Sequence, residues 1–367
     1  MVDKNYSLER RLAHDGVVHH PLGGGSYVFK KNYVDYLVRH LIKEKVRISI
    51  GAQPNSSPHF GTLVVFNLAY ALAQKMSARS DLIQPGVFFE VVDTAPSETR
   101  NVDGIDYQIS LRDSKVADNH LEEYFALLEL LKGFTGVDYA ARRQRDFNSQ
   151  QRVPAILRNI VKNRERIAPI LDSHRGLLRM RVACSDCGLA DKKGINNKYH
   201  DDKIESYCPE HGWFETSFDD ESAKFEYSTP LRNLIRAIVY ASDNQDKGVP
   251  FEWLRVTGSD YAGYYQEQLL YKSASLLGTP AHELPAIVYA PLVVDWSGAK
   301  LSKSLYVKQN AYKHLPQYLV NYNDFRDKLG ETGVRKMFEE VSSWLEESYK
   351  LFRSYSVYYF MEIFGDE

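Results

Sequence analysis

Residues 46–72 read VRISIGAQPNSSPHFGTLVVFNLAYAL, and the organisation of the whole chain follows from this stretch. Its first residues alternate β-branched with polar side chains from Val46 to Ile50, a pattern that predicts a strand entering the core. Pro54 and Pro58 then stop regular structure, because proline fixes φ and lacks an amide donor. The apolar residues that follow are spaced as on a buried helix, at Phe60, Leu63, Val64, Phe66, Leu68 and Leu72. The stretch therefore predicts a strand, a tight turn and a helix.

His59 is the residue at the mouth of the predicted helix. A helix start carries free backbone N–H groups and a partial positive charge, which together attract phosphate. Gly61 would let a ligand approach the backbone closely. A buried histidine beside a helix-capping turn accounts for the same residues without a ligand, so this segment alone leaves both interpretations open.

The phrase PNSSPHFGT at residues 54–62 resembles the HIGH signature of the class I aminoacyl-tRNA synthetases, with Phe60 where the signature has a smaller aliphatic residue. A second stretch, GAKLSKS at residues 298–304, resembles the KMSKS loop of the same class, with Leu301 in place of methionine. It follows an apolar run at residues 287–294, as the resemblance requires. A solvated basic turn is the ordinary explanation of an isolated Lys-Ser cluster. Two such elements in the right order, each after its own strand, favour the resemblance.

A third stretch, Gly258-Ser259-Asp260, follows a strand predicted at 251–256 and precedes a helix predicted at 261–277. It resembles the Gly-x-Asp segment that contacts the ribose of ATP in class I synthetases. An aspartate suits that role because its carboxylate accepts hydrogen bonds from ribose hydroxyls. Ser259 or Asp260 could also cap the helix, and the two roles are compatible.

The resemblance assigns roles to individual residues. Attack of a carboxylate on the α-phosphorus of ATP brings two anions together and so requires an electropositive site. The residues implied to be catalytic are His59, Lys300 and Lys303. The residues implied to bind ATP are Pro54, Gly61, Thr62, Gly258, Asp260 and Ser302. The candidate substrate-binding residues are Gln53, Asn55, Asp93, Tyr261, Tyr264 and Gln268. Asp93 ends a strand predicted at 86–93, where open α/β sheets bind ligands, although such an aspartate is also common in turns.

All three cysteines of the chain lie in two short Cys/His motifs. Two close pairs separated by a loop supply four soft or borderline ligands and suit tetrahedral zinc, the ligands being Cys184, Cys187, Cys208 and His211. A set that is already complete predicts a closed structural site rather than a catalytic one, and incidental thiols are the alternative. The region resembles the zinc-bearing insertion that divides the nucleotide fold of several class I synthetases, which implies a sheet split around residues 140–228.

Composition sets limits on the partners of the chain. The 46 Lys and Arg residues nearly balance the 48 Asp and Glu residues, so any RNA contact must rest on a local patch. The N-terminus lacks the apolar core of a signal peptide, and no apolar run reaches membrane-spanning length, which predicts a cytoplasmic protein without membrane partners. The sequence contains neither a Walker A motif nor a dinucleotide fingerprint, so ATP, if it is bound, is bound by a different kind of motif.

The predicted fold is α/β, with a Rossmann-like parallel sheet of HIGH/KMSKS type that is split by a zinc-binding insertion and followed by a short helical C-terminal region. Four units are expected: an N-terminal segment with the first half of the nucleotide fold at 1–140, the insertion at 141–228, the second half with the KMSKS-like loop at 229–310, and the helical region at 311–367. An aromatic run at 355–364 is expected to pack in the core, with stacking on RNA bases as the alternative.

The function implied by the resemblance is ATP-dependent activation of an amino acid to an aminoacyl-adenylate, with Mg²⁺, and transfer to the acceptor end of tRNA. The order of the motifs is most similar to that of the class I lysyl-tRNA synthetases, which makes lysine the candidate substrate. Only 63 residues follow Ser304 (367 − 304), fewer than the helical anticodon-binding domain of that branch needs. Two alternatives stay open: a free-standing ligase that joins an amino acid to a small amine or thiol, and a non-catalytic paralogue acting as a binding or regulatory protein. The sequence predicts no oligomeric state.

Overall fold

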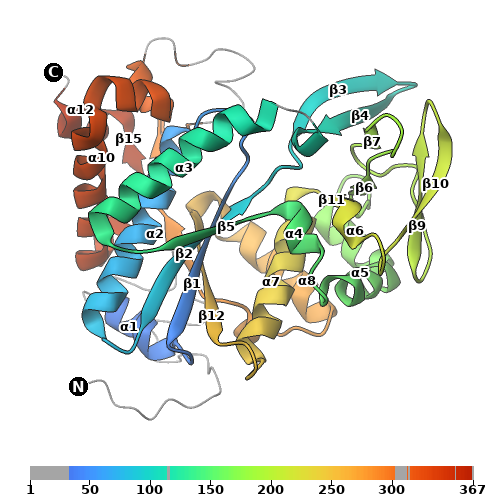
Figure 1. Cartoon of the computed structure of the whole chain (residues 1–367), viewed down its shortest axis with the longest axis horizontal. Helices are drawn as coiled ribbons and strands as arrows, with labels where there is room; N and C mark the ends of the chain where they lie inside the picture. Colours follow the sequence, from blue (N-terminus) through green and yellow to red (C-terminus); the bar gives the residue numbers. More distant parts are fainter. Residues whose placement is uncertain (1–32, 114–115, 302–311, 313–314, 352, 366–367) are drawn as a thin grey trace.

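The computed structural model describes residues 33–113, 116–301, 312, 315–351 and 353–365. The chain folds around one parallel β-sheet, with helices on both faces and a smaller β-rich region at one end (Figure 1). Ser302 and Lys303 of the KMSKS-like loop lie outside the described residues. No helix in the described part of the chain combines the length and the apolarity needed to cross a membrane.

The central sheet has five parallel strands in the order β13-β12-β1-β2-β5. Their bounds are β1 Lys45–Ala52, β2 Gln84–Val91, β5 Tyr139–Arg143, β12 Phe251–Gly258 and β13 Ile287–Ala290. Counted along the chain and read from β5, the order is 3-2-1-4-5, as in nucleotide-binding doubly wound sheets. The prediction of a Rossmann-like parallel sheet is confirmed. The strand order reverses between β1 and β12, which is where such sheets bind their ligands.

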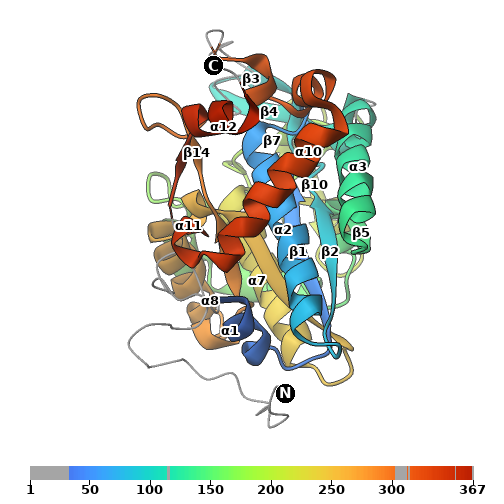
Figure 2. The ribbon, with the colours of Figure 1, turned by 90° about the vertical axis from the view of Figure 1, so that its left-hand side faces the viewer.

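Two hydrophobic cores cover the two faces of the sheet. Alternation along β12 sends Leu254 into the first core and its neighbour Trp253 into the second. The helices of the first core are α1 Tyr33–His40, α2 Phe60–Arg79, α3 Val116–Thr135, α10 Tyr322–Glu346 and α12 Val357–Phe364. In Figure 2, α10 lies along α2 on this face. The second core is built from α7, Thr229–Gln245, together with helices of the insertion.

The insertion is the part of the chain between β5 and α7. Its helices are α4 Gln144–Asn148, α5 Val153–Lys162 and α6 Arg164–Leu171, and its strands are β6 Met180–Val182, β7 Ala190–Asp191, β8 Lys198–Tyr199, β9 Lys203–Cys208, β10 Gly212–Ser217 and β11 Phe225–Tyr227. A hairpin of β3, Pro96–Val102, and β4, Ile105–Ser110, leaves the first half of the fold and pairs with β7. The insertion therefore packs on this hairpin, at the end of the molecule opposite to α10 and α12 (Figure 1). Since β5 belongs to the sheet, the first half of the fold reaches Arg143, beyond the expected boundary at residue 140.

The helix predicted at 261–277 is interrupted in the structure. Ser259–Tyr261 forms a short 3-10 turn, Gly263 adopts φ of 63°, and Tyr265–Tyr271 forms a π-helix before α8, Lys272–Leu276. A π-helix has i→i+5 hydrogen bonds, so its side chains do not follow the 3.6-residue period of an α-helix. Further short helices lie at Leu111–Asp113, Ser222–Lys224, Ala281–Glu283, Gln317–Leu319 and α11, Ser348–Leu351.

The aromatic end of the chain packs in the first core. β15, Tyr355–Ser356, pairs with β14, Val293–Val294, and leads into α12. The ring of Phe60, at the start of α2, has its centroid 5.9, 4.9 and 6.5 Å from those of Phe325, Phe360 and Phe364. The large side chain in the HIGH-like motif is therefore accommodated by the C-terminal tail. The expectation that this tail contributes to core packing is confirmed.

Candidate active site

A cavity of about 290 Å³ lies at the carboxyl ends of β1 and β12, where the strand order reverses. The turn between β1 and α2, the segment after β12 and the start of the KMSKS-like loop all line it. Of the residues predicted to bind or act on substrates, those that line the cavity are Gln53, His59, Gly61, Thr62, Gly258, Asp260, Tyr261 and Lys300. The fold thus brings parts of all three motifs around one hollow.

The HIGH-like turn is held in place by the C-terminal region. The N–H of Tyr322 donates to the carbonyl of Pro58 at 2.8 Å, and the N–H of Phe60 donates to the carbonyl of Val320 at 3.2 Å. The N–H of Thr62 donates to the carbonyl of the residue that precedes the helix, at 2.7 Å. Several amides at the start of α2 are therefore already bonded. A phosphate bound at this helix start would therefore be held mainly by side chains. The sequence alone suggests that free backbone amides hold it.

Gly61 leaves room for the imidazole of His59. A Cβ added at Gly61 would lie 2.9 Å from Cε1 and 3.1 Å from Nδ1 of that ring. His59 is the N-cap residue of α2, with extended backbone angles (φ −76°, ψ 162°), and its side chain is half-buried at the cavity. The glycine therefore determines where the imidazole sits, in addition to opening the backbone to a ligand.

Asp260 and Lys300 join the Gly-x-Asp segment to the KMSKS-like loop. The Nζ of Lys300 lies 2.5 Å from Oδ2 of Asp260. A Cβ added at Gly258 would lie 2.5 Å from the other carboxylate oxygen, so this glycine makes room for the aspartate. The side chains of Lys300 and Asp260 are 43% and 32% exposed. An ion pair this exposed contributes little to stability, so a ligand can displace it.

The wall of the cavity formed by α7 carries arginines that sequence reasoning did not single out as site residues. Arg232 and Arg236 lie one helical turn apart and are 6% and 7% exposed. Arg255 of β12 lines the same wall, and its Nη2 donates to Oδ1 of Asn233 at 3.1 Å. The available signal was two arginines at i, i+4 spacing within a helix that is otherwise rich in apolar residues. We call this surface the arginine wall, defined by Arg232, Asn233, Arg236 and Arg255.

A buried carboxylate behind the cavity neutralises part of the arginine wall. Glu90 of β2 is fully buried and accepts hydrogen bonds from Tyr240 and Arg142. It lies 3.8 Å from Nη2 of Arg236, which also donates to Gln144 at 2.7 Å. Burial would raise the pKa of Glu90, but the two guanidinium groups outweigh it and hold that pKa below its ordinary value. Glu90 is therefore an ionised partner for Arg236.

Several residues predicted for the site do not line the cavity. Tyr264 is 67% exposed and Gln268 is also exposed, because Gly263 and the π-helix that follows turn this segment away from the predicted helical path. Pro54 and Asn55 belong to the turn after β1 but lie outside the lining.

Asp93 is a further predicted residue outside the cavity lining. It follows β2 and is 1% exposed, while its neighbour Val92 reaches the cavity instead. Within the described residues, Oδ1 of Asp93 has no hydrogen-bond partner. Burial raises the pKa of Asp93, against the opposing effect of Arg112 and Arg143. The side chain therefore lies behind the site rather than in it.

The four predicted zinc ligands converge in the insertion. The ligand atoms of Cys184, Cys187, Cys208 and His211 all lie within 4.8 Å of one another. The Sγ atoms of Cys187 and Cys208 are 3.5 Å apart, and Nδ1 of His211 lies 3.6 and 3.5 Å from Sγ of Cys184 and Cys208. Four donors about 2.3 Å from a tetrahedral Zn²⁺ stand about 3.7 Å apart, so these side chains fit that ion. None of the four lines the cavity, which agrees with a structural role.

Purified protein is expected to contain about one equivalent of zinc, and Cys208→Ser is expected to lose it together with part of the stability of the insertion. Cys208 is buried at the end of β9, so its loss leaves the site with three ligands and a hydroxyl. Elemental analysis and melting curves check both effects. Ser185→Ala, an exposed position in the first Cys turn, is the matched control. Less than about half an equivalent in the unaltered protein would contradict the assignment.

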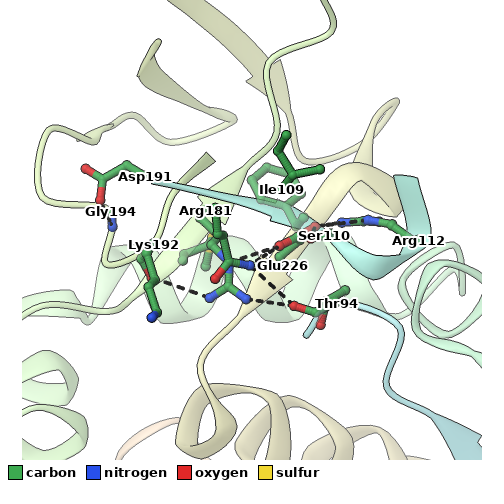
Figure 3. Close-up of polar contacts among 12 residues, drawn as sticks. Thr94, Ile109, Ser110, Arg112, Arg181, Asp191, Lys192, Gly194 and Glu226 are labelled. Carbon is green, nitrogen blue, oxygen red and sulfur yellow. Dashed lines mark hydrogen bonds and ion pairs between the residues drawn. The ribbon is translucent and has the colours of Figure 1, made fainter. Parts of the chain in front are cut away.

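A second buried carboxylate, Glu226 of β11, ties the insertion to the end of the β3–β4 hairpin and, through Arg181, to the loop after β2 (Figure 3). Nε and Nη2 of Arg112 lie 3.0 and 2.8 Å from its Oε1, and Nε of Arg181 lies 2.9 Å from its Oε2. Ser110 of β4 donates to the same carboxylate. Nη2 of Arg181 also donates to the carbonyl of Thr94, at 3.1 Å. The network therefore joins β4, β6 and β11 to the loop after β2, which contains Thr94.

Comparison with known proteins gives only remote likenesses. No family model matches the chain, and no curated protein matches it. A Campylobacter jejuni structure described as an arginyl-tRNA synthetase is similar at 12% identity and a TM-score of 0.35, over 84% of this chain and 68% of that one. A glutamate tRNA ligase from Elizabethkingia meningosepticum gives 15% and 0.31, over 72% of this chain and 53% of that one. A glutamate-tRNA synthetase from Elizabethkingia anophelis gives 14% and 0.32, over 72% and 54%. The chain spans about half the length of the two glutamate enzymes, and the likeness is too remote to assign a family or a substrate.

Proposed function

We propose that the chain activates an amino acid with ATP, forming an aminoacyl-adenylate and pyrophosphate, and transfers the aminoacyl group to the acceptor end of tRNA. One observation carries the proposal. His59, Asp260 and Lys300 come from three distant segments and line the same cavity. That cavity lies at the reversal of strand order in a parallel sheet, where open α/β sheets bind ligands.

In this proposal the nucleotide lies along the crevice between β1 and β12. Asp260 accepts hydrogen bonds from the ribose hydroxyls, with Gly258 keeping space for its carboxylate. Gly61 and Thr62 face the phosphates at the start of α2. Pro54 shapes the turn that leads to them, and Ser302 is assigned to the same nucleotide from the KMSKS-like loop. A ribose bound to Asp260 displaces Lys300, which is then available to the phosphates.

The proposed chemistry is an in-line displacement at phosphorus. A carboxylate oxygen of the amino acid attacks the α-phosphorus, a new P–O bond forms, and the bond from that phosphorus to the pyrophosphate oxygen breaks. His59 donates to the oxygens of the α- and β-phosphates, where negative charge grows. Lys300 and Lys303 stabilise the departing pyrophosphate, and a Mg²⁺ ion bound to the phosphates of ATP would supply further positive charge there. A hydroxyl oxygen of the terminal ribose of tRNA then attacks the carbonyl carbon and loses its proton to solvent, the bond from that carbon to the phosphate oxygen breaks, and AMP leaves. We propose Gln53 and Tyr261 as contacts of the amino acid, because both line the cavity.

ATP–pyrophosphate exchange with each of the standard amino acids, with and without bulk tRNA, tests the first step. Exchange with one amino acid is expected. Absence of exchange with every amino acid would contradict the proposal. It would favour the alternative that the chain is a non-catalytic paralogue. Acylation of bulk tRNA, compared with release of a small amide or thioester, distinguishes transfer to tRNA from the free-standing ligase.

Gly61→Ala is expected to lower the exchange rate by about 10²-fold, because the added methyl group displaces the imidazole of His59 from its position at the cavity. The melting temperature should change little, since the ring can rotate away. Gly133→Ala is the matched control, because Gly133 is an exposed residue of α3 whose added Cβ meets no atom within 4 Å. Exchange at the same rate in both variants would show that the position of the imidazole is immaterial.

A further inference from the structure

Arg232 is a buried cation on the arginine wall. Its Nη2 donates to Oγ1 of Thr229 at 3.2 Å, and its buried Nε has no hydrogen-bond partner among the described residues. Within the described residues, no carboxylate lies at ion-pair distance from it. Burial and the neighbouring guanidinium of Arg236 lower the pKa of Arg232 to about 9. Burying an unpaired charge is costly, so a cation kept at a cavity in this way indicates an anionic ligand.

Arg255 adds a second cation to the same wall. Its Nη2 donates to Asn233 at 3.1 Å, and its guanidinium carbon lies 5.9 Å from the centroid of the Tyr261 ring. Both partners are neutral, and no carboxylate in the described part of the chain forms an ion pair with Arg255. The wall therefore holds two guanidinium groups whose charge the protein leaves unbalanced.

The other charges at the cavity are already paired. Arg236 lies 3.8 Å from the buried carboxylate of Glu90. Among the described residues that line the cavity, Asp260 is the carboxylate, and it is bound to Lys300. The described residues thus offer the ligand a surplus of positive charge on the arginine wall and no free carboxylate beside it.

The arginine wall and His59 flank the cavity from opposite faces of the sheet. α2, which begins after His59, packs in the first core, whereas α7 packs in the second. Phosphates held at the start of α2 therefore leave the arginine wall to the second substrate. The anion that binds the arginine wall is therefore expected to belong to the amino acid and not to ATP.

We propose that the site takes an amino acid with an anionic side chain, aspartate or glutamate, whose distal carboxylate binds Arg232 and Arg255. The inference rests on the proposed function, because it names the substrate class of that same site. The α-carboxylate is not the anion in question, since it must remain free to attack phosphorus. A guanidinium fork suits a carboxylate because it can donate two parallel hydrogen bonds. A lysine side chain would add a cation to a wall without a free carboxylate, so the charges argue against lysine.

A comparison of five amino acids tests the proposal on the unaltered protein: aspartate, glutamate, asparagine, glutamine and lysine. ATP–pyrophosphate exchange is measured with bulk tRNA present, and binding of each amino acid is measured separately by its effect on the melting temperature. One acidic amino acid is expected to support exchange, with a KM on the order of 10- to 100-fold below that of its isosteric amide. This ratio corresponds to the loss of charge-assisted hydrogen bonds.

The possible results separate the two proposals. Exchange with lysine or a neutral amino acid, and not with an acidic one, would overturn the substrate class and leave adenylate formation standing. A melting-temperature shift specific to an acidic amino acid, without exchange for any amino acid, would overturn adenylate formation and support the anionic site. Neither exchange nor acid-specific binding would overturn both.

Arg232→Gln is expected to raise the KM for the acidic amino acid on the order of 10- to 100-fold, leave the KM for ATP unchanged, and move the preference toward the amide. Arg158→Gln is the matched control, because Arg158 is a partly exposed residue of α5 that is paired with Asp219 and does not line the cavity. A raised KM for ATP alone would place a phosphate at the arginine wall and overturn the proposal. Arg255→Gln carries the same expectations if Arg232→Gln does not fold.

Discussion

Replacement of His59 by alanine is expected to lower the rate of ATP–pyrophosphate exchange by about 10²- to 10³-fold, the loss typical of removing one preorganised donor to a developing charge. His59 stands at the N-terminus of α2 beside the cavity. The loss should appear in kcat more than in KM for the amino acid, because charge on the phosphoryl oxygens grows only toward the transition state. Lys300→Gln should lower kcat in the same way, because it removes a positive charge that stabilises the departing pyrophosphate.

The matched control for His59→Ala is His282→Ala. His282 is exposed in the short helix Ala281–Glu283 and does not line the cavity, so exchange should stay at the unaltered rate. Melting curves of both variants separate a loss of chemistry from a loss of fold. Retention of the full exchange rate by His59→Ala would refute the placement of the triphosphate at α2.

Glu226→Ala is expected to lower the free energy of unfolding by about 3–5 kcal/mol, because removing one partner of a buried ion pair leaves the other charges uncompensated. Glu226 is fully buried between Arg112 and Arg181 (Figure 3). Chemical denaturation followed by circular dichroism measures the change. Glu215→Ala, which removes an exposed carboxylate of β10 paired with Lys203, should leave the stability nearly unchanged. Equal free energies of unfolding in the two variants would show that the Glu226 network does not stabilise the fold.

The same carboxylate makes the stability depend on pH. Burial would raise the pKa of Glu226, but Arg112 and Arg181 outweigh it and hold that pKa below the ordinary value of 4.5. A lowered pKa means that the unfolded chain takes up the proton first as the pH falls. Glu226 therefore stabilises the fold fully above about pH 4.5, and its contribution is lost as the pH falls through the lower folded-state pKa. Stability measured across this acid range should fall less steeply in Glu226→Gln than in the unaltered protein.

The strand, turn and helix at residues 46–72 were predictable because their signals are local. A β-branched run, two prolines and a change of apolar spacing fix β1, the turn and α2 without help from the rest of the chain. The predicted zinc ligands were equally accessible, since the spacing within each Cys/His pair already limits where their side chains can lie. The convergence of His59 with Asp260 and Lys300 was expected only through the family resemblance, and the cavity now supports it.

The segment after Asp260 shows why other site residues could not be predicted. A regular helix from residue 261 would have carried Tyr264 and Gln268 toward the strand ends. The positive φ of Gly263 and the π-helix that follows change the direction of both side chains. Sequence periodicity cannot predict this change of direction. A search for apolar residues at the 3.6-residue spacing of an α-helix does not recognise a π-helix, whose side chains have a different period.

The arginine wall was missed for a different reason. Arg232 and Arg236 sit on a helix whose other residues are mostly buried and apolar, and arginines in such a pattern are ordinarily assigned to a solvated face. Their burial depends on β12, which packs against α7, and on Glu90, which comes from a strand made much earlier in the chain. Tertiary contacts of this kind decide the electrostatics of the site.

The order of strands in the sheet also has a consequence for how the protein is made. Between Ala52, the last residue of β1, and Gly258, the last residue of β12, the ribosome adds 206 residues (258 − 52). At about 5–20 residues per second, this takes roughly 10–40 s. During that time β1, which ends as the middle strand of the sheet, has an open edge of unpaired backbone groups, and such edges recruit other strands. The nascent chain therefore passes through an interval of aggregation risk that ends only when β12 pairs with β1.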